Sequence, residues 1–162
     1  MVALTGIELQ DWVEATFRGW KELISAHPEI LSFPCDIRET KSVAVLLQHI
    51  VAVEVRFAER LNDLPETPYE SIPFDSADAL YATHDRAMQL LRPLIDRDEM
   101  FWEKVLELKT RSVGVLRVTR RTVLVHLMMH SIRHCAQLAT LVRAHGIAPD
   151  WQMDYLMMKL EK

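Results

Sequence analysis

The chain has 162 residues, a length that suits one domain with a hydrophobic core of its own. Apolar residues make up 49% and charged residues 26%, and the net charge of −4 is mild, so the composition is that of a soluble globular protein. It argues against nucleic acid as a partner, and no apolar run is long enough for a membrane span.

Glycine and cysteine usage narrows the class further. The four glycines disfavour turn-rich β folds, and neither GxGxxG nor GxxxxGK[ST] occurs, so no phosphate-binding loop is expected. Cys35 and Cys135 lie far apart, and no signal peptide or secretory context supports a disulfide. We therefore expect a cytoplasmic protein with free thiols. Arg117, Arg120 and Arg121 form the only local basic cluster, which we interpret as a solvated helix entrance.

The first predicted helix spans residues 7–26, where most apolar residues recur at steps of three and four. Thr5 can cap its start with Glu8 as the capping-box partner, and Pro28 ends it. Residues 28–40 hold two prolines and predict a connection.

A second helix is predicted from near Ser42 to about Leu61, and a proline-rich loop follows over residues 62–75. Ser76 or Asp78 can cap a third helix. Pro93 either kinks this helix or ends it near Leu91.

Residues 99–118 are rich in β-branched side chains and predict either a short hairpin or irregular, extended chain. Thr119 then caps a fourth long helix over residues 120–144, which Gly146 stops. Residues 150–162 predict a short amphipathic helix or a strap. The residues expected to pack it on the body are Trp151, Tyr155, Leu156 and Leu160. Together the long segments predict one all-α domain, residues 1–162, built as a helical bundle.

Three histidines stand at four-residue steps in the last long helix: His126, His130 and His134. Side chains at i and i+4 share a helix face, so two adjacent imidazoles can bind one divalent metal ion. The spacing leaves open which pair binds, because His126 and His134 differ by about 80° of rotation. A third ligand must come from elsewhere, and His49, within an apolar helix face, is the candidate. Ser131 follows His130 where HExxH enzymes have a glutamate base.

The alternative is that these histidines are surface residues or hydrogen-bonded core residues, which is the commoner role of an HxxxH pair. The apolar neighbours of the stripe favour a ligand role, because a buried imidazole must find partners. Three imidazoles suit zinc or nickel and leave one or more coordination positions open.

The block HLMMHSIRHCAQLATLVRAHG resembles the terminal-helix signature of the DinB-like superfamily, HxxxHxxxHxxQ. His49, in SVAVLLQHIVAVE, resembles the first metal ligand of that family. The resemblance covers nearly the whole chain and implies a four-helix bundle with an up-down-down-up course. It implies His49, His130 and His134 as metal ligands, with His126 at a histidine that is not usually one. Where the family often has Arg-Gly or Trp-Ala before the glutamine, this chain has Cys135 and Ala136.

Family members of known activity are metal-dependent enzymes that act with low-molecular-weight thiols, as S-transferases or isomerases. The resemblance therefore implies a metalloenzyme with a small-molecule substrate, and it implies a homodimer. The alternative hypothesis is a non-catalytic bundle that binds a metal or ligand in stress response or association.

Four further side chains are candidates for the surroundings of the ion. Gln137 would orient a ligand or bound water, or simply pack between helices. Arg56 would receive an anionic substrate or pair with a surface carboxylate, and His126 would lie beside the ligands or on the surface. Glu54 is a weaker candidate acceptor for an imidazole N–H, because it is rotated by about 140° from His49.

Overall fold

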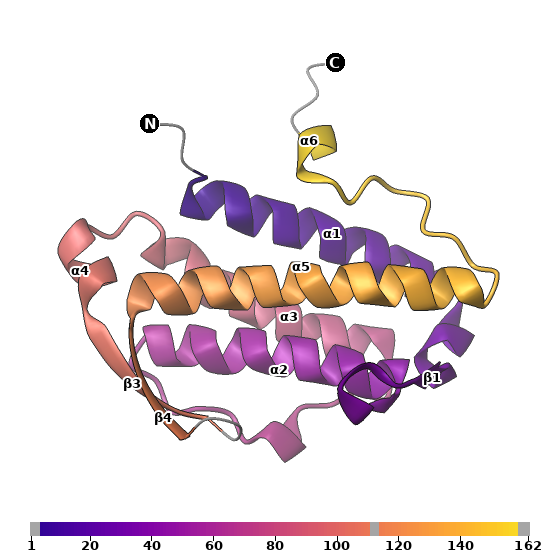
Figure 1. Cartoon of the computed structure of the whole chain (residues 1–162), viewed down its shortest axis with the longest axis horizontal. Helices are drawn as coiled ribbons and strands as arrows, with labels where there is room; N and C mark the ends of the chain where they lie inside the picture. The colour runs from indigo at the N-terminus through magenta and orange to yellow at the C-terminus, as the bar shows by residue number, and fades with distance from the viewer. Residues whose placement is uncertain (1–3, 111–113, 159–162) are drawn as a thin grey trace.

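The structure, a computed structural model, describes residues 4–110 and 114–158 (Figure 1). These residues are mostly helical, as the all-α prediction expects, with two small antiparallel sheets added. The α-helices are α1 (Gly6–Ala26), α2 (Val43–Leu61), α3 (Ala77–Leu91), α4 (Glu99–Glu103), α5 (Arg120–Ala144) and α6 (Tyr155–Met158). The strands are β1 (Pro34–Cys35) paired with β2 (Lys41–Ser42), and β3 (Val105–Thr110) paired with β4 (Gly114–Thr119). Short 3-10 helices occupy Pro28–Ser32, Ile37–Glu39, Tyr69–Ser71 and Arg92–Leu94.

Capping side chains set the starts of the long helices. The Thr5 side chain accepts a hydrogen bond from Glu8 N, and the Glu8 carboxylate accepts from Thr5 N at 2.9 Å, which confirms the capping box. Ser76 rather than Asp78 caps α3, since its Oγ accepts from Ala79 N. Thr119 caps α5 as predicted. Each cap satisfies a backbone donor that has no partner inside the helix.

The four long helices enclose one core. α1 and α2 each pack against both α3 and α5, and α1 and α5 run opposite to α2 and α3 (Figure 1). Fully buried large side chains fill the space between them. The largest are Trp20, Tyr81, Phe17, Ile24, Ile30, Leu46, Leu47, Ile50, Leu61, Leu80, Leu91 and Leu127.

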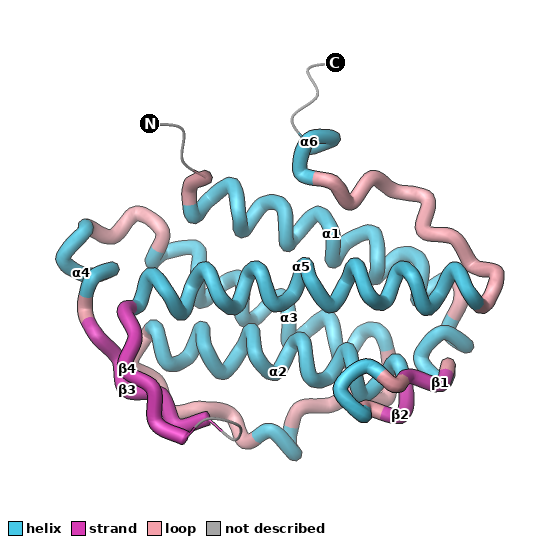
Figure 2. The backbone as a smooth tube through the Cα atoms, in the orientation of Figure 1, coloured by secondary structure: helices cyan, strands magenta, loops and turns pink. Residues whose placement is uncertain are grey.

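The segment between α3 and α5 is more regular than the sequence predicts. It begins with α4, whose cap is the Asp98 side chain on Phe101 N. The β3–β4 hairpin follows (Figure 2), so the hairpin alternative holds and the irregular one is wrong; residues 111–113 of the segment lie outside the described residues. Arg120, predicted to be solvated, is only 2% exposed. Its guanidinium binds the Asp63 carboxylate at 2.7 Å and lies over the Phe101 ring, so Arg120 joins α5 to the end of α2.

Residues 147–153 form a strap along α1. Trp12 Nε1 donates to the Met153 carbonyl at 2.7 Å, and the Trp151 ring meets the Trp20 ring edge to face, with 5.1 Å between centroids. A Cβ on Gly19 would overlap the Trp151 ring, so glycine is what lets the strap lie this close. Tyr155 binds Glu8.

Two residues predicted to pack in the tail are placed differently. Leu156 is 71% exposed and therefore does not pack as predicted, because α6 turns it toward solvent. Leu160 lies outside the described residues. In the part of the chain that the structure describes, no helix combines the length and apolar character needed to cross a membrane.

Candidate metal centre

Helices α2 and α5 pack together and bring three histidines to one point. One ring nitrogen from each of His49, His130 and His134 lies within 4.8 Å of the other two. His49 Nε2 and His130 Nε2 are 3.0 Å apart. Two imidazoles bonded to one zinc ion at about 2.0–2.1 Å have nitrogens about 2.9–3.4 Å apart, for angles between 90° and tetrahedral. The separation of His49 and His130 therefore matches two ligands of one ion, and the three residues together form a group that could hold a divalent metal.

Burial and neighbouring cations keep these imidazoles neutral, the form in which imidazole binds a metal. Burial lowers the pKa of His49 to about 4, and the positive charge of Arg38 adds to the effect. Burial lowers the pKa of His130 to about 2, with contributions from His134 and His49. The pKa of His134 is also lowered by burial, against a hydrogen bond to Gln137 that raises it.

Gln137 orients one of the three imidazole rings. Its Oε1 accepts from His134 Nδ1 at 2.7 Å, which leaves His134 Nε2 directed toward the other two histidines. Arg133 also reaches this nitrogen, with its guanidinium 3.3 Å from His134 Nε2. His130 Nδ1 has no hydrogen-bond partner among the described residues, so the only polar contact of that ring found there is the one between its Nε2 and His49 Nε2.

Two other predicted residues lie near the histidine cluster but outside it. His126 is not part of the three-residue group, and its ring centroid lies 5.8 Å from that of His130 and 5.9 Å from that of Phe57. Arg56 pairs with Glu66 at 2.7 Å, the second of its predicted roles. Both side chains line the same cavity as His49 and His130.

This cavity has a volume of about 730 Å³ and a cationic lining, and we call it the metal-side cavity. Its basic residues are Arg38, Arg56, Arg60, Lys109 and Arg133, and its acidic residues are Glu66 and Glu70. Glu66 is held by both Arg56 and Arg60. Arg38, Lys109 and Arg133 form no ion pair with a carboxylate among the described residues, so the cavity favours an anionic ligand.

The sequence did not predict Arg38 or Arg133 as part of this region. Arg38 lies in the connection before α2 with a φ of 54°, a left-handed conformation that few non-glycine residues adopt. The prolines predict the connection itself, but its left-handed backbone conformation at Arg38 has no signature in the sequence. Arg133 is adjacent to a ligand candidate, but on an ideal helix it points about 100° away, and only its length brings it back.

Glu54 is not the acceptor for His49 that the sequence analysis considered. It is fully buried and binds His84 Nδ1 of α3 at 2.8 Å and Ser131 Oγ of α5 at 2.6 Å. Glu54 occupies a position of the apolar stripe of α2, between Val51 and Ala58, and a carboxylate there was the available signal of a buried polar network.

The chain matches the DinB family over residues 6–161, nearly its whole length, and it belongs to that family. No curated protein gives a significant match that would assign a particular activity.

Proposed function

We propose that this DinB family member is a metal-dependent enzyme that holds a divalent ion, zinc or nickel, through His49, His130 and His134. The proposal places the site on a four-helix bundle with an up-down-down-up course. The observation that carries it is the convergence of three neutral imidazoles, from two helices, at the wall of a cationic cavity of about 730 Å³.

The chemistry follows from the charge of such a site. A divalent ion held by three neutral ligands keeps its full charge and would stabilise an anionic sulfur or oxygen beside it. Gln137 fixes the His134 ring, while Arg38, Lys109 and Arg133 attract the carboxylates of an incoming molecule. A low-molecular-weight thiol with carboxylate groups fits this lining, and the corresponding activities are S-transfer and isomerisation.

The test uses protein purified without a histidine tag and two measurements. Metal content is determined for the wild type, for His130→Ala and for the control His126→Ala. Turnover is followed with monochlorobimane as electrophile and a panel of bacillithiol, mycothiol and glutathione, before and after chelation. We expect stoichiometric metal in the wild type and in His126→Ala, its loss in His130→Ala, and thiol consumption that stops on chelation and returns with zinc or nickel.

Two outcomes contradict the proposal in different ways. Protein without stoichiometric metal, or with the same metal content after His130→Ala, removes the metal site itself. If the protein carries stoichiometric metal whose removal lowers the melting temperature, but no thiol of the panel is consumed, the protein is a non-catalytic metal-binding protein and not an enzyme.

A further inference from the structure

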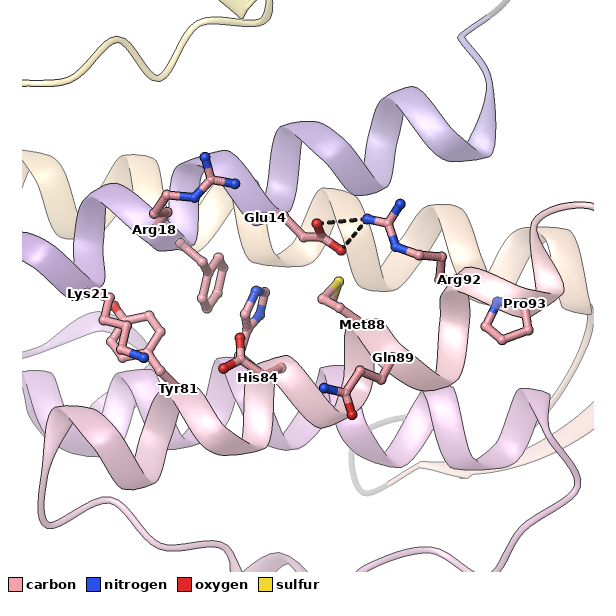
Figure 3. A pocket seen from close by; sticks show the side chains of 11 residues that line it. Glu14, Arg18, Lys21, Tyr81, His84, Met88, Gln89, Arg92 and Pro93 are labelled. Atoms are coloured by element: carbon pink, nitrogen blue, oxygen red, sulfur yellow. Dashed lines mark hydrogen bonds and ion pairs between the residues drawn. The ribbon is translucent and has the colours of Figure 1, made fainter.

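A second cavity lies between α1 and α3, and no residue of its lining is shared with the metal-side cavity (Figure 3). Its volume is about 540 Å³, which is within the range of small-molecule sites. We call it the α1–α3 cavity. The proposed metal site makes no use of it.

A buried hydrogen-bonded group, formed by His84, Glu54 and Ser131, lies next to this cavity. His84 of α3 lines it and is only 3% exposed. Its Nδ1 is 2.8 Å from Glu54, and the other Glu54 oxygen accepts from Ser131 Oγ at 2.6 Å. Ser131 is not placed to act as a nucleophile, because its hydroxyl is fully buried and donates to the Glu54 carboxylate rather than to an imidazole nitrogen.

The other ring nitrogen of His84, Nε2, is not in contact with Glu54. No hydrogen bond to this nitrogen is found among the described residues, although the side chain is almost entirely buried. The imidazolium form of His84 would balance the charge of the fully buried Glu54 carboxylate, 2.8 Å from its Nδ1. In that form Nε2 carries a proton, so the site presents a charged donor without a protein acceptor.

The walls of the cavity combine flat apolar surface with positive charge. Phe17 of α1 stacks on the His84 ring, with centroids 4.0 Å apart and planes 5° from parallel, and Met88 lies on the other side of His84 (Figure 3). Arg18 and Lys21 also come from α1, and neither forms an ion pair among the described residues.

The remaining charges of the lining do not cancel this positive charge. Arg92 is neutralised by Glu14, whose two oxygens it binds at 2.8 Å. Asp85 is the one remaining carboxylate of the lining, and it is exposed at the rim. Arg18 and Lys21, two cations without a carboxylate partner among the described residues, therefore face one rim carboxylate.

We propose that the α1–α3 cavity binds a small organic carboxylate with a planar apolar body. The carboxylate accepts a hydrogen bond from His84 Nε2 and is attracted by Arg18 and Lys21, while the apolar body lies against Phe17 and Met88. The imidazolium then bridges two carboxylates, that of Glu54 from the core and that of the ligand from the cavity.

Benzoate is the probe, because it combines a carboxylate with a flat apolar ring, and benzamide is the uncharged control of the same shape. Each is titrated into isotope-labelled full-length protein while the His84 ring signals are followed by NMR. The test variant is Arg18→Ala/Lys21→Ala, which changes partly or fully exposed side chains and leaves the core intact. The matched control is Arg117→Ala/Arg143→Ala, which removes the same charge from exposed positions elsewhere.

We expect a saturable shift of the His84 Nε2 signal with benzoate, absent with benzamide, and affinity about tenfold or more weaker in Arg18→Ala/Lys21→Ala but unchanged in the control variant. Benzoate that shifts His49, His130 and His134 while His84 stays unaffected binds the metal side and overturns the proposal. A His84 shift that is equal with benzamide, or undiminished in Arg18→Ala/Lys21→Ala, overturns it as well. Inorganic phosphate that binds as tightly as benzoate overturns the assignment to carboxylates.

Discussion

His134 Nδ1 donates a hydrogen bond to Gln137 Oε1 at 2.7 Å, within a single turn of α5. This contact fixes which ring nitrogen of His134 carries a proton and therefore which one is available as a ligand. It also joins Gln137 to the histidine cluster through a side-chain hydrogen bond three residues after His134.

Replacing Gln137 tests that relationship. Gln137→Leu removes the acceptor, so we expect metal affinity to fall about 10- to 100-fold with little change in stability. Gln137→Glu keeps an acceptor for Nδ1–H and is expected to retain most of the affinity. Competition titration with a chromophoric chelator measures both variants. If Gln137→Leu binds zinc as tightly as the wild type, the hydrogen bond does not organise the site.

The metal-free protein is expected to lose stability as the pH falls below about 6.5. Burial holds the pKa of His49 at about 4 and of His130 at about 2 in the folded protein, whereas both titrate near 6.5 when unfolded. Between about pH 6.5 and these lower pKa values, the unfolded chain binds protons that the folded chain does not. The free energy of unfolding therefore decreases as the pH falls.

The free energy of unfolding falls by at most about 1.4 kcal/mol per pH unit for each histidine. Urea unfolding of chelator-treated protein between pH 7 and pH 5 measures it, with His130→Gln as the comparison. This variant should show a flatter pH dependence, because one lowered pKa is gone. Equal slopes for the two proteins would mean that His130 does not carry the effect.

The buried carboxylate of Glu54 is expected to be critical for stability. Glu54→Ala leaves His84 and Ser131 without their shared partner in the core, and we expect a loss of about 3–5 kcal/mol. The control Glu22→Ala removes an exposed carboxylate and should change stability by less than about 0.5 kcal/mol. Urea unfolding of the metal-free protein compares them, and a similar small loss in both would contradict the structure.

Gly19→Ala is expected to change stability in the opposite direction to the usual glycine-to-alanine substitution in a helix. Alanine in place of glycine inside a helix normally stabilises by about 0.5–1 kcal/mol, but here the new Cβ overlaps the Trp151 ring, so Gly19→Ala should destabilise. In a Trp151→Ala background the overlap disappears and the same substitution should become stabilising. Melting temperatures of the four proteins measure this coupling. Additive effects would show that the strap does not lie against Gly19 in solution.

Local signals in the sequence predicted the long helices well. Thr5, Ser76 and Thr119 cap α1, α3 and α5 where hydroxyl side chains precede periodic apolar runs. The helix α4 was missed because five residues are too few to show a helical period, even though Asp98 provides its cap. The strand pairing of β3 with β4 was left open because β4 is largely exposed and shows no alternation of burial.

In the candidate metal site too, some features are set within one helix and others by contacts between residues far apart in the sequence. The step from His130 to His134 is a property of one helix and is readable in the sequence. The approach of His49 to His130 spans 81 residues. The position of His49 in an apolar helix face made it a candidate, and the family resemblance then assigned it as the third ligand. The Glu54–His84 contact was not predicted at all, because periodicity identifies a buried face without saying which residue of another helix will meet it.

The strap over α1 also bears on how the chain is made. Trp12 and the Met153 carbonyl that it binds are separated by 141 residues. On the ribosome α1 is synthesised early, and the segment that covers Trp12, Gly19 and Trp20 emerges only after the other long helices are complete. Until the strap has been synthesised, the nascent chain therefore lacks the segment that covers these aromatic residues of α1.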